Sequence, residues 1–302
     1  MLNSNQKTKK ERNTNSEKPL PLMQQLMIQA FLLFVAFTVL FPIMWIVSLS
    51  FDASGLRPEF SFIPKEFSVE AYKKVLQQPT ANPVSFARLT FNSFKLAGGV
   101  SLFSVGIGIL AAYAFSRMKF PGREVLMLGV IAVLMLPAIA TIAPLFVLLN
   151  GIQLGDFNLR ASLWGVGIAM TSGALPFAIW NLKGYLDTIP KELEEAAIID
   201  GASPHQVFYH VTLPLARPAI AVTGFLGFLG GWTEFALSWQ FLSKPEDFTL
   251  AMSLYNMTGQ YASNTPWAEF AAMSLLIALP VALVYLSLQQ YIVSGLTIGG
   301  VK

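Results

Sequence analysis

Six long apolar stretches, almost free of charge, constrain the fold of this chain more than any other feature. Four of them contain no Asp, Glu, Lys or Arg, one contains only Lys95 and one contains only Glu234. Each is long enough to cross the hydrocarbon core of a bilayer as a helix, which takes roughly 20 apolar residues. We therefore predict an all-α integral membrane protein with six transmembrane helices, at residues 26–51, 91–116, 125–150, 161–181, 218–241 and 271–293.

The charged residues cluster outside these stretches. Only 12% of the chain is charged and the net charge is +3, so a basic face for nucleic acid is not expected. There is no cysteine, which excludes a disulfide, a thiol nucleophile and cysteine-ligated zinc. His205 and His210 stand five apart, and this spacing places them on different faces of a helix, so we expect no metal site there.

The distribution of Lys and Arg predicts the orientation. Twelve of the 20 Lys and Arg residues lie in the N-terminal tail (1–25), in the polar loops beginning at 117 and 183, and at the C-terminus. Seven lie in the opposite loops, five of them in the loop 52–90. The positive-inside rule favours cytoplasmic termini by this modest margin. The first segment would then be a basic cytoplasmic tail, 52–90 an extracytoplasmic loop and 294–302 a cytoplasmic tail.

Two features inside the predicted spans have two readings each. Glu234 is an acidic residue well within a span, where such groups are costly and commonly functional. It would either line a translocation path or make a structural hydrogen bond. Gly227 and Gly231 stand four apart, which lets helices approach closely. That approach would be to another helix of this chain or to a partner subunit.

The polar interruption 188–217 carries helix signals of its own. Pro190 suits the first position of a helix, and Gly201 suits a helix end that needs a left-handed residue. Ser203 and Pro204 suit the N-cap and first residue of a second helix.

We expect this second helix to end at Leu213-Pro214. Two helices of about ten residues are marginal alone in water and need a surface to pack on. Helical spacing places Leu193, Ala196, Ala197 and Asp200 on one face. The surface would be either a cytoplasmic partner or the chain's own bundle.

The same loop carries a motif. Glu195-Ala196-Ala197 is followed after three residues by Gly201, and after nine more by Val211-Thr212-Leu213-Pro214. This segment resembles the EAA loop of permease subunits in binding-protein-dependent ABC importers, whose pattern is E-A-A, three residues, G, nine residues, I-x-L-P. The one departure is conservative, with Val211 in place of isoleucine.

The resemblance extends through most of the chain from residue 26 onward. The segments NSFKLAG (92–98), AYAFSRMKFPGR (112–123) and GLTIGGVK (295–302) are similar to the carbohydrate-uptake branch, and taken together to its maltose and maltodextrin permeases. The resemblance implies a type I ABC importer permease fold with its core at 91–293. It also implies a multi-pass protein of the bacterial cytoplasmic membrane that moves sugar by alternating access.

The resemblance implies partners and assigns roles. A second, different permease subunit, two copies of an ATPase and an extracytoplasmic sugar-binding protein would complete the importer. The loop 188–217 would seat in the ATPase, with Glu195 offering an ion pair, Ala196 and Ala197 allowing close packing and Gly201 allowing the turn. Gly299 and Gly300 would reach the same interface. This chain would be non-catalytic and bind no cofactor, while ATP-Mg would sit on the partner ATPase.

The outward loops 52–90 and 243–269 would face the binding protein. The second of them holds polar and aromatic residues suited to protein or sugar contact, or to an ordinary connecting loop: Tyr255, Asn256, Tyr261 and Asn264.

Other function classes remain as alternatives. The substrate could be a different oligosaccharide, or the chain could be a stand-alone secondary transporter or a membrane enzyme. A secondary transporter would show more than one ionisable group inside the membrane, and an enzyme would show a cluster of catalytic residues. The sequence contains no G-x-x-x-x-G-K-[ST], H-E-x-x-H or G-x-S-x-G motif.

Overall fold

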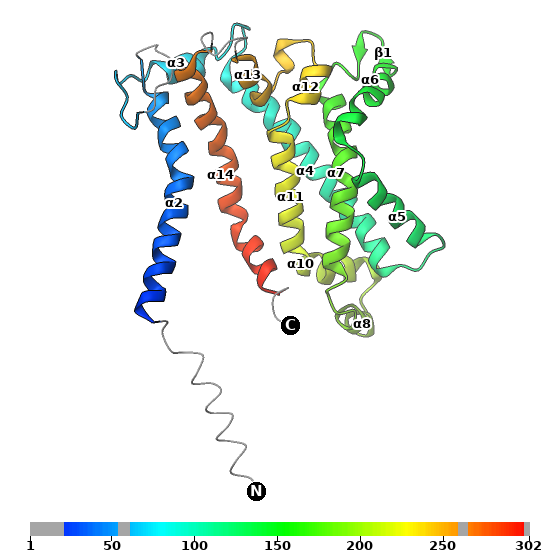
Figure 1. Ribbon diagram of the computed structural model, residues 1–302. Coiled ribbons are helices and arrows are strands. Elements are labelled where there is room, and N and C mark those ends of the chain that lie inside the picture. The colour runs from blue at the N-terminus through cyan, green and yellow to red at the C-terminus, as the bar shows by residue number, and fades with distance from the viewer. Residues whose placement is uncertain (1–20, 54–60, 259–264, 299–302) are drawn as a thin grey trace.

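The long helices of the molecule run side by side, with shorter elements at both ends (Figure 1). The computed structural model describes residues 21–53, 61–258 and 265–298, with the backbone alone for 292–298. Four helices are long and apolar enough to cross a membrane, and two bent helix pairs bring the number of candidate spans to six at most. The four are α2 (Leu22–Ser50), α4 (Phe86–Arg117), α7 (Leu163–Leu186) and α14 (Trp267–Ile298). The all-α multi-pass fold is confirmed.

The first bent pair corrects the prediction of one continuous helix at 125–150. Helix α5 (Arg123–Leu134) is followed by a 3-10 turn, η1 (Ala138–Thr141), and by α6 (Ile142–Asn150), and the chain bends by 101° at the break. Pro137 lies in that break with an extended backbone. A proline has no N–H for the helix ladder and disfavours helical geometry in the residue before it, so the helix ends there.

The predicted span 218–241 is also interrupted. Helix α11 (Arg217–Trp232) ends before Glu234, and a separate short helix, α12 (Ala236–Phe241), follows. The second bent pair is instead α11 with the segment Pro204–Leu215, at 72°. Glu234 therefore lies in a break between two helices and not inside a continuous span.

The shorter elements gather at the two ends of the bundle. Helices α3, α12 and α13 lie at one end, whereas α8 and α10 lie at the other, together with the start of α2 and the end of α14 (Figure 1). Their bounds are α3 (Glu70–Gln77), β1 (Gln153–Leu154), β2 (Phe157–Asn158), α8 (Glu192–Ile199), α9 (Pro204–Val207), η2 (Phe208–Thr212), α10 (Leu213–Leu215), η3 (Pro245–Asp247) and α13 (Leu250–Asn256). The two strands form an antiparallel hairpin.

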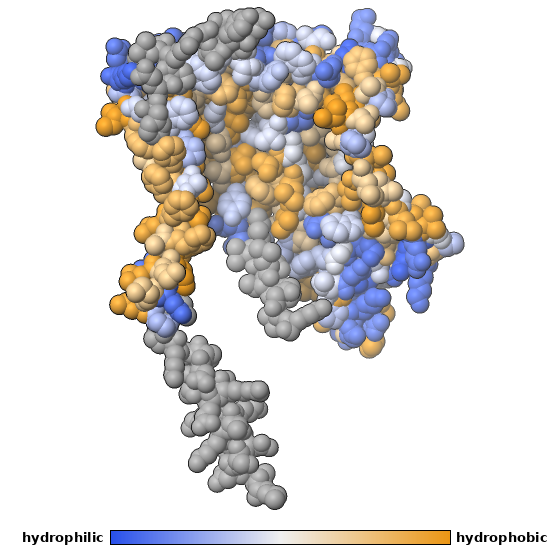
Figure 2. Space-filling model, viewed as in Figure 1, coloured by the Kyte–Doolittle hydropathy of each residue, from blue (hydrophilic) through white to orange (hydrophobic). Residues whose placement is uncertain are grey.

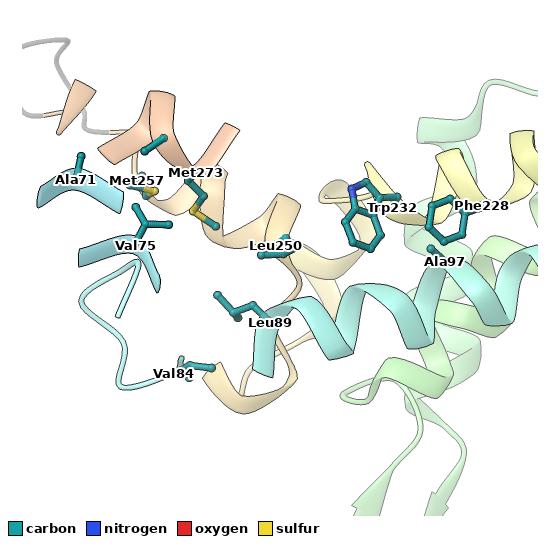
Figure 3. Close-up of a cluster of buried hydrophobic side chains, with 11 residues drawn as sticks. Ala71, Val75, Val84, Leu89, Ala97, Phe228, Trp232, Leu250, Met257 and Met273 are labelled. Carbon is teal, nitrogen blue, oxygen red and sulfur yellow. The ribbon is translucent and has the colours of Figure 1, made fainter. Parts of the chain in front are cut away.

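Helix α4 packs against both α7 and α11 and contributes many of the buried residues. A cluster at the α3 and α13 end joins it to four other helices, with Leu89 and Ala97 of α4 against Trp232 and Leu250 (Figure 3). Other sides of the long helices expose large apolar residues, which colour much of α2 orange in Figure 2. Such surface suits lipid or a partner subunit, because soluble monomers rarely expose large apolar patches.

The paired glycines pack within the chain. A Cβ placed on Gly231 would lie 2.6 Å from the Cα of Ala97, and one on Gly227 would lie 3.2 Å from the Cα of Ser101. Both neighbours belong to α4, so these glycines let the backbones of α11 and α4 meet. The structure therefore supports the first of the two readings of these glycines.

We predict that Gly231→Ala destabilises the protein by about 1–3 kcal/mol, because the added methyl group must push α4 and α11 apart. Gly230→Ala is the matched control, since its Cβ would meet nothing within 4 Å. Both changes replace a helical glycine with alanine. The difference between the unfolding temperatures of the two variants in detergent therefore reports only the effect of the added methyl group on helix packing. Equal unfolding temperatures for the two variants would contradict the packing assignment.

Candidate functional site

The first half of the polar loop is a short helix that ends on a left-handed glycine. Helix α8 starts at Glu192, two residues after the predicted start at Pro190. Gly201 has φ of +90°; its N–H donates to the Ile198 carbonyl, and the Ala202 N–H donates to the Ala197 carbonyl. This pair of bonds is a Schellman motif, so the predicted role of Gly201 at the helix end is confirmed.

A Cβ on Gly201 would meet nothing within 4 Å in the described part of the chain. Its left-handed backbone, and not crowding inside this chain, is therefore what favours glycine here.

The second half of the loop begins as predicted and ends later. The Ser203 hydroxyl accepts from the Gln206 N–H, and the Gln206 side chain accepts from the Ser203 N–H, which is a capping box with Pro204 in the first turn. The helix does not stop at Leu213-Pro214 but runs on to Leu215. A π-helical turn, η2, precedes the proline and offers a physical reason, because it shifts the hydrogen-bond ladder that Pro214 cannot join.

The motif residues lie in or next to α8, η2 and α10, and they differ in exposure. Glu195, Ala196 and Gly201 are exposed; Ala197, Val211, Leu213 and Pro214 are half-buried. Helix α8 also turns large apolar side chains outward, with Ile199 86% exposed and Leu193 and Ile198 about half exposed. The loop therefore packs on its own bundle through Ile189 and Phe208 but leaves an apolar surface of α8 uncovered, as the docking alternative requires.

A buried ion pair holds α8 to the end of α4. Arg117 Nε lies 2.9 Å from Glu194 Oε1, and the two side chains are only 7% and 9% exposed. Thr212 donates to the same carboxylate oxygen over 3.0 Å, and Arg117 also donates to the Ile189 carbonyl and the Ser116 hydroxyl. These bonds satisfy the buried charges, as burial requires.

Sequence reasoning missed Glu194 and Arg117 as a unit. The available signals were a second glutamate directly before the E-A-A motif and an arginine at the end of a predicted span.

The same network reaches the end of α7 through Asp187. The carboxylate accepts from Ser116 and from Lys183, each over 2.6 Å. Burial acts to raise the pKa of Asp187, but the hydrogen bonds from Lys183 and Ser116 and the charges of Lys183 and Arg117 outweigh it and hold the pKa below its ordinary value.

Glu234 caps the start of α12. One carboxylate oxygen accepts from the Leu237 N–H over 2.6 Å, and the other accepts from the Ser238 N–H over 3.0 Å and the Ser238 hydroxyl over 2.6 Å. A carboxylate at a helix N-terminus satisfies backbone donors and interacts favourably with the helix dipole. These bonds supply the structural role that was one of its two readings.

Two of the remaining candidates lie in α13, and four lie outside the described residues. Tyr255 stacks on Phe235 and makes an edge contact with Trp239, while Asn256 lines a surface cavity between α3 and α14. Tyr261, Asn264, Gly299 and Gly300 lie outside the described residues. Across 21–53, 61–258 and 265–298, no three or more His, Asp or Glu side chains are grouped so as to hold a metal ion.

Residues 104–298 match the model of the family described as binding-protein-dependent transport system inner membrane component. The chain belongs to this family. The matched region includes the whole polar loop, so the buried ion pair and the exposed α8 are features of a transport permease.

Individual relatives match nearly the full length of the permease. It is 36% identical to the maltose/maltodextrin transport system permease protein MalG of Vibrio vulnificus, over 87% of this chain and 91% of that protein. It is 34% identical to the galactooligosaccharides transport system permease protein GanQ of Bacillus subtilis, over 90% and 93%.

Solved structures share the fold. A chain of a bacterial ABC transporter that imports the acidic polysaccharide alginate superimposes with a TM-score of 0.69 at 22% identity, covering 91% of this chain and 99% of that one. A chain of the MetNI methionine ABC transporter, in an inward-facing conformation, gives a TM-score of 0.55 at 18% identity, covering 69% and 95%.

We predict that Glu234→Gln lowers the free energy of unfolding by about 1 kcal/mol, because the N-terminal charge of α12 is lost while its side-chain shape is kept. Glu246→Gln, at an exposed site, is the control. Thermal unfolding in detergent and uptake per assembled complex should be measured together. Unchanged stability with reduced uptake would contradict the capping role and place the carboxylate on the translocation path.

We predict that Asp187 stabilises the loop at neutral pH and that this effect disappears in acid. A carboxyl whose pKa is lower folded than unfolded contributes fully above its unfolded pKa of about 3.9 and loses that contribution as the pH falls through the folded value. The unfolding temperature of Asp187→Asn should therefore lie below wild type at pH 7, and the gap should close below about pH 4. Asp156→Asn, in the exposed hairpin turn, should show no such gap, and a gap for Asp187→Asn that persists into acid would refute the prediction.

Proposed function

We propose that this chain is a transmembrane permease subunit of an ATP-driven, binding-protein-dependent sugar importer, with maltose or maltodextrin as its substrate. The observation that carries the proposal is the EAA loop, folded into a capped helix with an uncovered apolar face, in a member of the transport family. The sugar class is supported by relatives whose names specify oligosaccharides.

A different oligosaccharide is the second candidate. The identity to the galactooligosaccharide permease, 34%, is close to the 36% shared with a maltose/maltodextrin permease. Substrate contacts therefore decide between the two sugars, and a transport assay must offer both.

The partners of this permease would be a second permease subunit, an ATPase dimer and an extracytoplasmic sugar-binding protein. Helix α8 would dock on the ATPase. Its exposed Leu193, Ile198 and Ile199 would then be buried in the interface, and Glu195 would form an ion pair with a basic residue of the ATPase. Closure of the ATPase on ATP-Mg would move α8, and the spans would alternate between inward-open and outward-open states. This chain would supply no catalytic group.

The orientation follows from this role. The end that carries α8 would face the cytoplasm of a bacterial cell, with the protein in the cytoplasmic membrane. Tyr255, Asn256, Tyr261 and Asn264 would then face the binding protein, and Gly299 and Gly300 would lie on the ATPase side.

We predict that Gly201→Asp abolishes co-purification of the ATPase, because a charged side chain would project from the exposed end of α8 into the partner. Gly122→Asp is a close control: Gly122 also has positive φ, +81°, and open space at its Cβ, but it lies outside the loop 188–217. Affinity purification in mild detergent with mass spectrometry gives the readout. Retention of the ATPase by the Gly201→Asp variant would contradict the docking assignment.

The purified complex should then be reconstituted in proteoliposomes. ATP-dependent uptake of radiolabelled maltose, maltotriose and a galactooligosaccharide, each with its binding protein, decides the substrate. Uptake by this chain alone without ATP would refute the importer and favour a secondary transporter.

A further inference from the structure

The ion pair between Arg117 and Glu194 differs in burial from the other ion pairs among the described residues. Both of its side chains are less than 10% exposed. Each of the other pairs, Lys73–Glu70, Lys74–Glu269 and Lys183–Asp187, has a side chain at least 43% exposed. Exposed pairs contribute little and separate easily, whereas separating a buried pair leaves two charges without compensation. The Arg117–Glu194 contact is therefore the hardest of them to pull apart.

This contact joins two elements that are distant in sequence. Arg117 is the last residue of α4, and Glu194 lies in the first turn of α8, 77 residues later. The body of α8 lies mainly against α9 and η2, within its own loop. Thr212 of η2 donates to the same oxygen of Glu194, so one carboxylate connects both halves of the loop to a spanning helix.

Helix α4, on the arginine side of this ion pair, is closely packed against two other helices. Helix α4 meets α11 at Gly227 and Gly231, and it meets α7 where a Cβ on Gly108 would lie 3.0 Å from the Cβ of Ala178. Packed interiors have low compressibility and transmit displacement instead of absorbing it. A displacement of α8 that reached Arg117 would thus move three helices together.

We propose that Arg117 and Glu194 are positioning residues that make α8 and the end of α4 move as one body during transport. This inference rests on the proposed function. Glu195, which is exposed, would contact the partner, while the adjacent Glu194 points inward and passes the motion of α8 to the spans. The two neighbouring glutamates therefore have different tasks.

A covalent tether tests this assignment, since the chain has no cysteine of its own. In the double variant Arg117→Cys/Glu194→Cys, both buried charges are removed together. We expect the assembled complex to hydrolyse ATP but to transport at least about fivefold less sugar per ATP than wild type. A short bifunctional methanethiosulfonate that bridges the two thiols should restore transport, and a reductant should reverse the rescue.

A purely structural pair gives a different pattern. It predicts that any double variant that assembles transports normally, or that bridging the thiols changes nothing, and either result would overturn the proposal.

Single substitutions provide the second test. Glu194→Gln keeps the shape but removes the charge, and it should lower sugar transported per ATP while the ATPase still co-purifies. Glu192→Gln removes the same charge from the same turn of α8 at an exposed site and should leave this ratio unchanged. Equal ratios for the two variants, or failure of both Glu194→Gln and the double cysteine variant to assemble, would assign the pair to folding alone.

The experiment separates this proposal from the proposed function. If the wild-type complex shows no ATP-dependent sugar uptake, the importer assignment is wrong. If wild type transports and the tether does not rescue the double cysteine variant, only the positioning role is wrong.

Discussion

The close approach of α4 to α7 and α11 is the constraint on which the rest of the molecule depends. Between helices in lipid there is little hydrophobic driving force, so association relies on van der Waals contact, which small residues permit. Gly231 and Gly227 of α11 meet Ala97 and Ser101 of α4, and Gly108 of α4 meets α7. These three helices are the closely packed part of the bundle: α5 lies against α7, α14 lies against α11, and the polar loop is tied to the end of α4.

The polar loop combines an exposed apolar surface with a fixed position on the bundle. Helix α8 exposes large apolar side chains, and the loop is nevertheless held in place against the end of α4. A Schellman motif and a capping box satisfy its backbone locally, and the Glu194 carboxylate and the Phe208 ring tie it to Arg117 and Tyr113 of α4. The surface of α8 can therefore stay uncovered while the loop keeps its position, which is what the proposed docking to an ATPase requires.

Local signals in the sequence were accurate where a single residue type has one dominant conformation. Gly201 at a left-handed helix end and Ser203-Pro204 at a helix start were both predicted and both observed. Apolar length alone was less informative, because it cannot show where a helix bends. Pro137 lies in the break of one predicted span. Glu234 lies in the break of another, where its carboxylate accepts a hydrogen bond from the first turn of α12.

The sequence by itself determined the membrane class, the approximate spans and the EAA loop, because hydropathy over 20 residues and a motif within 20 residues are local properties. Only the tertiary structure decided which side chains meet. It paired Arg117 with Glu194 and not with the motif residue Glu195, and it placed Gly231 against α4 and not against a partner. Such contacts join residues far apart in the chain, and the direction in which each helix turns its side chains is set by packing against the others.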